Sequence, residues 1–253
     1  MESISIKNLK FSYTTLISSE SPKKQEKLFK ILDGVNLSLE KGDILCITGK
    51  SGEGKSSFLR VIAGLEKAAS GEMSLFGEPV KQNEWTALSM ALKGVGFVFQ
   101  NDALISDLTV KDNIAVPLHY HKMGTEEEIE QKAQRALMLM LASSFADEFP
   151  YSLSLGMRKR VAIARAWALD ARILLLDEPT AGLDKNSRIN LLSLVDNLRE
   201  LYKTTIIMVV SDLQVANELN SKISFLIDKK LTPPMYFNEI KENENPHIRA
   251  MIR

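Results

Sequence analysis

The sequence has little cysteine and no long hydrophobic run. Cys46 is the only cysteine among the 253 residues, so no disulfide can form within the chain, as is usual in reducing compartments. No uncharged apolar stretch approaches the ~20 residues of a membrane-spanning helix. The first residues, SISIKNL, alternate and lack the apolar segment of a secretion signal. We therefore expect a cytoplasmic chain that reaches a membrane only through a partner.

An excess of charge of either sign is also missing. Lysine plus arginine and aspartate plus glutamate each total 32, so no overall basic field favours binding to nucleic acid. Hydrophobic residues make up 45% of the chain, which argues against disorder and suffices for a full core. The composition predicts one large domain or a domain with a subdomain.

Strand-like segments recur along the chain. Alternating residues predict strands at 4–13 and 31–40, and the polar, charged stretch 14–27 between them predicts an exposed loop. Apolar runs rich in isoleucine, leucine and valine predict buried parallel strands, at 42–49, 172–179 and 204–212.

Helical patterns lie between these strands. A helix is expected at 56–63, and another at 125–143, where Thr125 and Glu128 have the spacing of a capping box. Residues 102–169 are mainly helical in pattern. The sequence therefore predicts strands alternating with helices and a helical segment set between strands.

The segment GKSGEGKSS carries the clearest chemical signal. Gly49, Gly54, Lys55 and Ser56 match the phosphate-binding pattern G-x-x-x-x-G-K-[ST], after a predicted strand and before a predicted helix. Glycines let the loop curl so that its N–H groups face phosphates, and the start of the helix adds positive charge. Lys55 would reach the β- and γ-phosphates of ATP, and Ser56 would bind Mg²⁺. The alternative is a glycine-rich turn that serves only the fold. The expected nucleotide contacts in the loop are Gly49, Lys50, Ser51, Gly52, Glu53, Gly54, Lys55, Ser56 and Ser57.

Two acidic residues end the apolar run ILLLDEP. Asp177 closes a predicted strand, at the sheet edge where the phosphate-binding loop is expected, and can hold Mg²⁺ directly or through water. Glu178 can act as general base on the water that attacks the γ-phosphate. An isolated Asp-Glu pair would be a solvated strand end, but after a phosphate-binding loop the catalytic interpretation is favoured.

These motifs resemble the ATPase subunit of ABC transporters, from about residue 4 to residue 229. The resemblance implies an α/β P-loop NTPase fold with a mainly parallel core sheet, an N-terminal antiparallel β subdomain and an inserted helical subdomain. It implies ATP and Mg²⁺ as ligands. The expected segments are a first part of the core with the β subdomain, the helical subdomain with the signature motif, a second part of the core and a tail, at 1–101, 102–169, 170–230 and 231–253.

Three further positions match residues that this family uses. Gln100 matches the glutamine that links Mg²⁺ and the attacking water to the helical subdomain, with a polar strand end as the alternative. Asp184, in AGLD, matches the aspartate that communicates across the dimer. Tyr13 matches the aromatic residue that stacks on adenine; Phe11 is a second candidate, and a core position is the alternative for both.

The segment YSLSLGMRKR departs from the family's signature motif. Ser154 and Gly156 match it, whereas Leu155 and Met157 replace a glycine and a glutamine. In the family two copies join head to tail, and this segment faces the γ-phosphate bound by the partner. The leucine side chain either faces the partner, where it hinders close approach, or faces the helical subdomain, where it packs. The sequence leaves both directions open.

A second departure lies at Ser211, where the family usually has the switch histidine. A serine is shorter and uncharged, so it can reach the γ-phosphate only through a bridging water. We therefore expect secure ATP binding and slow hydrolysis. The expected catalytic residues are Glu178, Gln100 and Ser211, and the expected Mg²⁺ ligands are Ser56, Gln100 and Asp177.

Other features resemble the ATPases of Mla-type lipid transporters, which work with MCE-domain proteins. They are Met157 with the following RKRVAIARA, residues 102–118 and the tail 242–252, which in that group packs on the neighbouring ATPase subunit. The implied partners are a second ATPase subunit, identical or not, an integral membrane permease and an MCE-domain lipid-binding protein, with no nucleic acid. The chain would be peripheral on the cytoplasmic face of the inner membrane. Residues 102–112 are candidates for the groove that holds a permease helix.

Three alternatives to lipid transport need weighing, and the sequence argues against the last of them. The chain can serve another ABC importer or exporter, or it can be a regulatory cassette that binds ATP with little hydrolysis. Leu155 and Ser211 favour the regulatory cassette, whereas Asp177 and Glu178 oppose it. ABC proteins that act on DNA or ribosomes carry two cassettes in one chain or a long coiled-coil insertion, and this sequence has neither.

Overall fold

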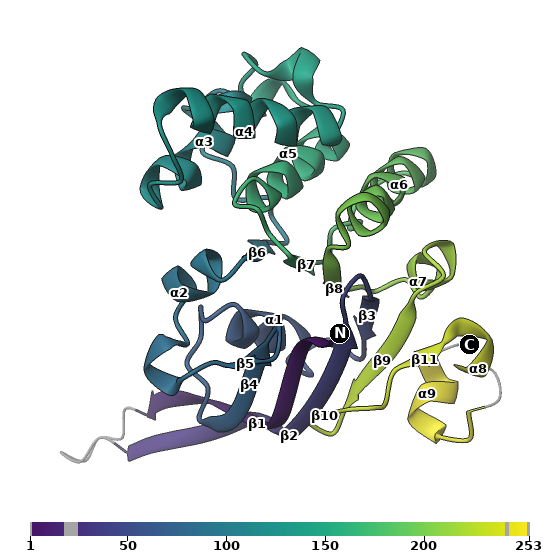
Figure 1. Ribbon diagram of the computed structural model, residues 1–253. Helices are drawn as coiled ribbons and strands as arrows, with labels where there is room; N and C mark the ends of the chain where they lie inside the picture. Colours follow the sequence, from purple (N-terminus) through teal and green to yellow (C-terminus); the bar gives the residue numbers. More distant parts are fainter. Residues whose placement is uncertain (1, 18–24, 241–242, 252–253) are drawn as a thin grey trace.

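Parallel strands form the centre of the chain in the computed structural model, which describes residues 2–17, 25–240 and 243–251 (Figure 1). A seven-stranded sheet has the order β10-β9-β3-β8-β7-β6, with β11 paired to β9. Its parallel strands are β3 (Ile44–Thr48), β6 (Val95–Val98), β7 (Ile173–Asp177), β8 (Thr205–Val209) and β9 (Lys222–Ile227). Two short strands pair antiparallel with β9, namely β10 (Lys230–Leu231) and β11 (Met235–Tyr236).

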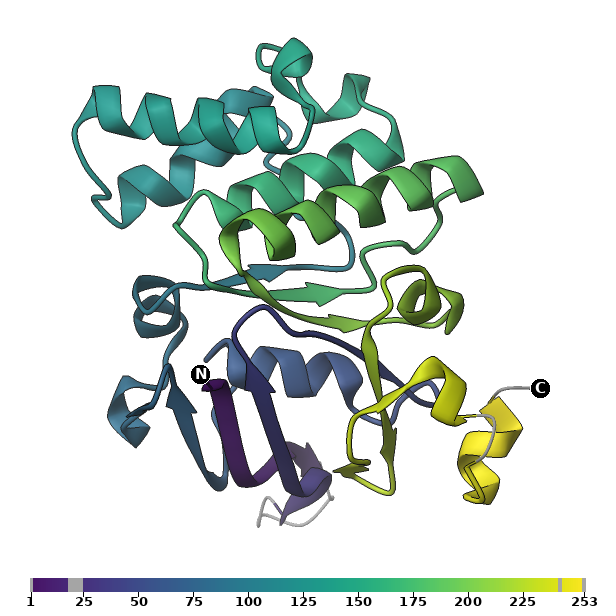
Figure 2. The same ribbon diagram turned by 45° about the vertical axis from the view of Figure 1, so that its right-hand side comes forward.

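Both faces of this sheet are covered, which explains why its strands are apolar throughout. Along β7, Ile173 and Leu175 pack toward one hydrophobic core, and Leu174 and Leu176 pack toward the other. The first core lies between the parallel sheet, α1 (Lys55–Ile62) and an antiparallel sheet. Figure 2 shows α1 between the two sheets.

The N-terminal region forms the antiparallel sheet, with the order β2-β1-β4-β5. Its strands are β1 (Glu2–Ile17), β2 (Gln25–Glu40), β4 (Ser70–Leu75) and β5 (Glu78–Pro79). The predicted loop at 14–27 is wrong in part, because Thr14 pairs with Leu28 and Ile17 pairs with Gln25. An antiparallel hairpin can expose polar residues to water, so polarity alone did not identify these strand ends. Residues 18–24 lie outside the described part of the chain.

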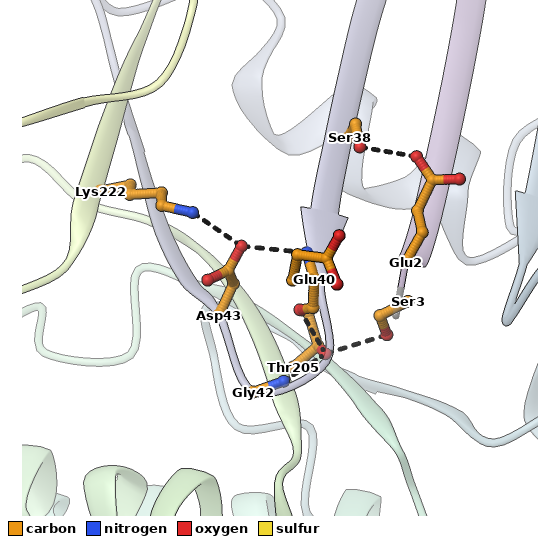
Figure 3. A network of polar contacts seen from close by, with 8 residues as sticks. All are labelled: Glu2, Ser3, Ser38, Glu40, Gly42, Asp43, Thr205 and Lys222. Carbon is orange, nitrogen blue, oxygen red and sulfur yellow. Dashed lines mark hydrogen bonds and ion pairs between the residues drawn. The ribbon is translucent and has the colours of Figure 1, made fainter.

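A polar network joins the two sheets at the end of β2 (Figure 3). The Thr205 hydroxyl of β8 accepts from the Gly42 N–H at 3.1 Å and donates to Ser3 Oγ of β1 at 2.9 Å. Asp43 lies 2.9 Å from the Lys222 ammonium of β9 and accepts from the Glu40 N–H at 3.0 Å. These contacts fix the antiparallel sheet against the ends of the central strands.

Helices cover the other face of the central sheet and form a separate layer beyond it (Figure 1). Residues 102–169 are mainly helical, as predicted, and the predicted capping box is present, with Thr125 N donating to Glu128 Oε2 at 2.7 Å. The predicted helix at 125–143 ends early because Leu141 has a left-handed φ of 51°. The remaining helices are α2 (Ala87–Leu92), α3 (Val110–Tyr120), α4 (Glu126–Leu139), α5 (Leu155–Trp167), α6 (Lys185–Tyr202), α7 (Gln214–Glu218), α8 (Phe237–Ile240) and α9 (Pro246–Met251).

The C-terminal helices pack on the chain's own core. Ile240 of α8 is fully buried and Ile248 of α9 is 1% exposed, in the core that covers the second face of the sheet. Within the described residues, no helix has both the length and the apolar character needed to cross a membrane. The structure thus has the predicted mainly parallel core sheet, with an antiparallel sheet from the N-terminal region and a helical region set between strands.

Candidate nucleotide site

The loop between β3 and α1 requires glycine at two positions. A Cβ atom added to Gly54, whose φ is 99°, would lie 2.3 Å from Ile31 Cγ2. A Cβ atom added to Gly49 would lie 2.6 Å from Leu226 O. The loop therefore approaches β2 and β9 closely and ends at the first turn of α1, whose N–H groups have no partners within the helix. This cradle has the chemistry that binds phosphate.

The Lys55 ammonium lies across the loop. It donates to Gly49 O at 2.8 Å and to Lys50 O at 2.9 Å. Desolvation by burial lowers the pKa of Lys55, while the charges of Glu178, Glu53 and Asp177 oppose this shift. An anion bound in the cradle would favour the charged form of Lys55 and so oppose the effect of desolvation on its pKa. The site is therefore suited to a phosphate group.

Two oxygen-bearing side chains that are predicted Mg²⁺ ligands meet at the end of β7. The Ser56 hydroxyl of α1 donates to Asp177 Oδ1 at 2.8 Å, and Asp177 is only 2% exposed. A hydroxyl and a carboxylate beside a phosphate cradle fit Mg²⁺, which binds oxygen ligands and keeps several of its waters. Hard-cation chemistry therefore suits these two residues.

The next residue, Glu178, turns back into the cleft. Its φ of 49° is left-handed, and its N–H donates to Val209 O at 3.1 Å. The Ser211 hydroxyl donates to the Glu178 carboxylate. The structure thus brings these predicted catalytic residues into contact through the ends of β7 and β8.

A cleft of about 320 Å³ joins the glycine loop, Lys55, Ser56 and Glu178, whereas Asp177 and Ser211 do not line it. Gln100, which follows β6, contributes to its wall, and so does Tyr13 of β1, whose hydroxyl lies 3.2 Å from Ser57 Oγ. Phe11 is 3% exposed and belongs to the core beneath Tyr13. The lining residues are Tyr13, Ile31, Ser51, Gly52, Gly54, Lys55, Ser56, Ser57, Gln100, Glu178 and Val209. Of these, Ile31 and Val209 were not predicted, because contacts between segments distant in sequence bring them to the loop.

The signature residues Ser154, Leu155, Gly156 and Met157 do not line this cleft. Ser154 is exposed and is the N-cap of α5, with its hydroxyl accepting from the Met157 N–H at 3.3 Å. The Leu155 side chain contacts the loop that follows β7 in the same chain. The evidence is the position of Leu155 Cδ2, which would lie only 3.1 Å from a Cβ atom added to Gly182. This direction is neither of the two considered from sequence. Nothing in the contact blocks the exposed start of α5.

Asp184 ends the same loop and begins α6. Its carboxylate accepts from the N–H groups of Asn186 at 2.9 Å and Ser187 at 3.0 Å. The hydrogen bond from the Ser187 side chain is the main cause that lowers the pKa of Asp184. A Cβ atom on Gly156 would lie 3.5 Å from Ser187 Cβ, so the start of α5 and the start of α6 are neighbours within one chain.

Comparison with known proteins places this geometry in a family. The protein-family model described as "ABC transporter" matches residues 32–181, which is more than half of the 253 residues. The probable sulfate/thiosulfate import ATP-binding protein of Chlorella vulgaris is 39% identical over 203 residues, covering 80% of this chain and 84% of that protein. The methionine import ATP-binding protein of Legionella pneumophila strain Lens is 33% identical over 87% of this chain and 64% of its own length. The spermidine/putrescine import ATP-binding protein of Thermotoga maritima is 39% identical over 78% of this chain and 52% of its own length. The chain thus spans less than two thirds of these last two relatives.

Solved structures agree in fold. A dimeric ATP-binding cassette in a post-hydrolysis state, bound to ADP and Pi, has a TM-score of 0.76 and 30% identity, covering 92% of this chain and 98% of that one. A nucleotide-free ATP-binding cassette from an ABC transporter has a TM-score of 0.82 at 23% identity over 100% of this chain and 99% of that one, and supports the fold alone. With the family model and the relatives in agreement, the chain belongs to the ABC transporter family as one of its ATP-binding cassettes, an ATPase that uses ATP with Mg²⁺.

Proposed function

We propose that the chain is the ATP-hydrolysing subunit of a membrane transporter, working as a head-to-tail pair on the cytoplasmic face of a permease. One observation carries the proposal: Ser56 and Glu178 line one cleft at the glycine-built loop, and Asp177 lies directly behind Ser56, whose hydroxyl donates to it at 2.8 Å. These are the oxygen groups that hydrolysis of a phosphoanhydride needs beside a phosphate cradle. Membership of a transporter family supports the membrane partner.

Each residue of the cleft has a proposed task. The loop N–H groups and Lys55 bind the phosphates, and Tyr13 stacks on the base. Ser56 and Asp177, with Gln100, hold Mg²⁺, which neutralises phosphate charge when bound. Glu178 accepts a proton from the attacking water.

We also propose the division of the chain into the segments 1–101, 102–169, 170–230 and 231–253.

A second copy would complete the site. The exposed Ser154 hydroxyl and the N-terminus of the 13-residue helix α5 form a donor surface that this chain's own cleft does not use. The Leu155 side chain packs against Gly182 of the same chain. We therefore propose that Ser154, Leu155 and Gly156 still receive the partner's γ-phosphate, with Asp184 at the dimer contact.

Ser211 sets the expected rate. It donates to Glu178 but supplies no positive charge toward a phosphate. Loss of one preorganised contact to the transition state costs on the order of 10²-fold in rate. We propose weakened hydrolysis rather than none, because Glu178 keeps a fixed position.

The permease would dock in an apolar groove of about 310 Å³ between the core and the helical region. Phe97 and Phe99 at the end of β6 form part of it, together with Val116 and Pro117 of α3. Of residues 102–112, which were the sequence candidates, none lines this groove. We therefore place the permease helix beside residues 97–99, next to Gln100, where closure of the ATP site would move it.

Two cargoes stand as candidates. Met157, the RKR that follows it and the tail motivate phospholipid transport with an MCE-domain partner. The named relatives are import ATP-binding proteins for sulfate or thiosulfate, methionine, and spermidine or putrescine, which favours import of a small solute. Isolation of the chain from membranes with its permease separates them: an MCE-domain protein in the complex supports lipid transport, and a permease with a solute-binding protein refutes it.

Phosphate release by the isolated complex tests the proposed function. Glu178→Gln should lower release by on the order of 10²-fold or more while ATP binding persists, because the substitution removes the proton acceptor and keeps the shape. Glu78→Gln, the same substitution at an exposed position of β5, serves as the control. Unchanged transport and phosphate release in Glu178→Gln would refute hydrolysis at this site and favour the regulatory cassette.

A further inference from the structure

Cationic residues of α5, the helix that begins with the signature residues and is called the signature helix below, bind the turn that follows Gln100. The Lys159 ammonium of α5 donates to Gln100 O and lies 2.9 Å from Asp102 Oδ1. Lys159 is 2% exposed and Asp102 is 5% exposed, so this ion pair is buried. Arg158 Nε lies 3.6 Å from the other carboxylate oxygen of Asp102.

The turn itself has an uncommon backbone. Asp102 and Ala103 are consecutive non-glycine residues with left-handed φ angles of 60° and 51°. Such a conformation persists only where its surroundings hold it. Arg165, also on α5, supplies part of that hold, donating to Asp102 O at 2.9 Å and to Ala103 O at 2.8 Å. The start of this loop is therefore shaped by α5 as well as by β6.

Lys159 combines two features that make it the centre of this contact. It lies five positions after Ser154 on the same helix, and it touches the backbone of Gln100, which lines the nucleotide cleft. A buried ammonium needs a paired carboxylate, and Asp102 provides it. A displacement of α5 would thus move the Gln100 carbonyl directly, without passing through the central sheet.

We propose that Lys159 is a positioning residue that ties Gln100 of one ATP site to the signature helix of the same chain, which serves the other ATP site. The proposal rests on the proposed role of Gln100 at Mg²⁺ and the attacking water. Lys159 acts through Gln100 and touches no reacting atom. Engagement of α5 by the partner then sets the Gln100 side chain in its own cleft.

A double-mutant cycle on the whole chain tests this. Lys159→Met should lower kcat by roughly 10-fold and raise the Mg²⁺ concentration for half-maximal hydrolysis, while the Kd for ATP changes less than about threefold. In the Gln100→Ala background, Lys159→Met should have almost no further effect. Lys159→Arg should restore most of the rate, because it keeps the charge and the donors.

Lys132→Met is the matched control, because Lys132 also pairs with an aspartate, Asp170 at 2.7 Å, but on the surface of the helical region. Its rate should stay that of the wild type. Equal rate losses from Lys159→Met with and without Gln100→Ala, or no loss at all, would overturn the proposal. If Lys159→Met does not fold, Lys159→Gln decides by the same comparison.

The role of Gln100, on which this inference rests, is tested in the same series, and Glu178→Gln tests hydrolysis itself independently. If Gln100→Ala alone leaves kcat and the Mg²⁺ dependence unchanged, then Gln100 has no role at the metal and the inference falls with it. If Gln100→Ala lowers kcat and Lys159→Met does not, only the inference is wrong.

Discussion

Replacement of Gly54 by alanine should lower the stability of the protein, because the Ile31 side chain occupies the space that the new Cβ atom needs. Gly54→Ala places a Cβ atom 2.3 Å from Ile31 Cγ2 at a φ of 99°. The left-handed backbone costs roughly 1–2 kcal/mol for a residue with a Cβ, and overpacking against a stiff β-branched side chain adds about 1–3 kcal/mol. At about 2–4 °C per kcal/mol for a chain of this size, the melting temperature should fall by roughly 4–20 °C.

Gly52 provides the matched control. Its φ is 82°, but a Cβ atom there would meet nothing within 4 Å, so Gly52→Ala should show the backbone cost alone. Ile31→Ala removes the side chain beyond Cβ, including Cγ2. Relative to Ile31→Ala alone, it should recover the overpacking part in Gly54→Ala and nothing in Gly52→Ala. Thermal unfolding of five variants measures this, namely the three single substitutions and the two glycine substitutions combined with Ile31→Ala. Equal losses from both glycine substitutions, or no coupling between Gly54 and Ile31, would refute the reasoning.

Two other predictions follow from the site and the core. Ser211→His should raise steady-state phosphate release by about 10-fold or more, because it adds a donor toward the γ-phosphate; a wild-type rate typical of transporters and no gain in the variant would contradict this. Burial raises the pKa of the Cys46 thiol from 9.0 to about 12. The unfolded thiol ionises first as pH rises, so the contribution of Cys46 to the free energy of unfolding is complete below pH 9.0 and is lost between pH 9.0 and about 12. Cys46→Ala should weaken this alkaline destabilisation in thermal melts from pH 8 to 11, and the native thiol should resist alkylation at pH 8; equal alkaline loss in both proteins would contradict it.

Local chemistry made the phosphate cradle and the acidic strand end predictable. A glycine pattern between a strand and a helix specifies its own geometry, and an apolar strand ending in Asp177 reaches the same sheet edge. The capping box at Thr125 and Glu128 was predictable for the same reason, since both partners lie within one turn.

Contacts between distant segments were not predictable from these patterns. Leu155 contacts Gly182, which lies 27 positions away, and Ile31 of β2 contacts Gly54 of the loop after β3. The link from Lys159 to Gln100 spans 59 positions and has no periodic signal. The strand ends at 14–17 and 25–27 were missed because the stretch 14–27 as a whole is polar and charged, which is typical of a loop.

Calorimetric titration with ATP, with and without Mg²⁺, tests the central claim most directly, in the wild type and in Asp177→Asn. The account predicts one ATP bound per chain, tighter with Mg²⁺ in the wild type, and loss of that Mg²⁺ dependence in the variant, because Ser56 and Asp177 hold the ion. Failure of the wild type to bind Mg-ATP, or an unchanged Mg²⁺ dependence in Asp177→Asn, would contradict it.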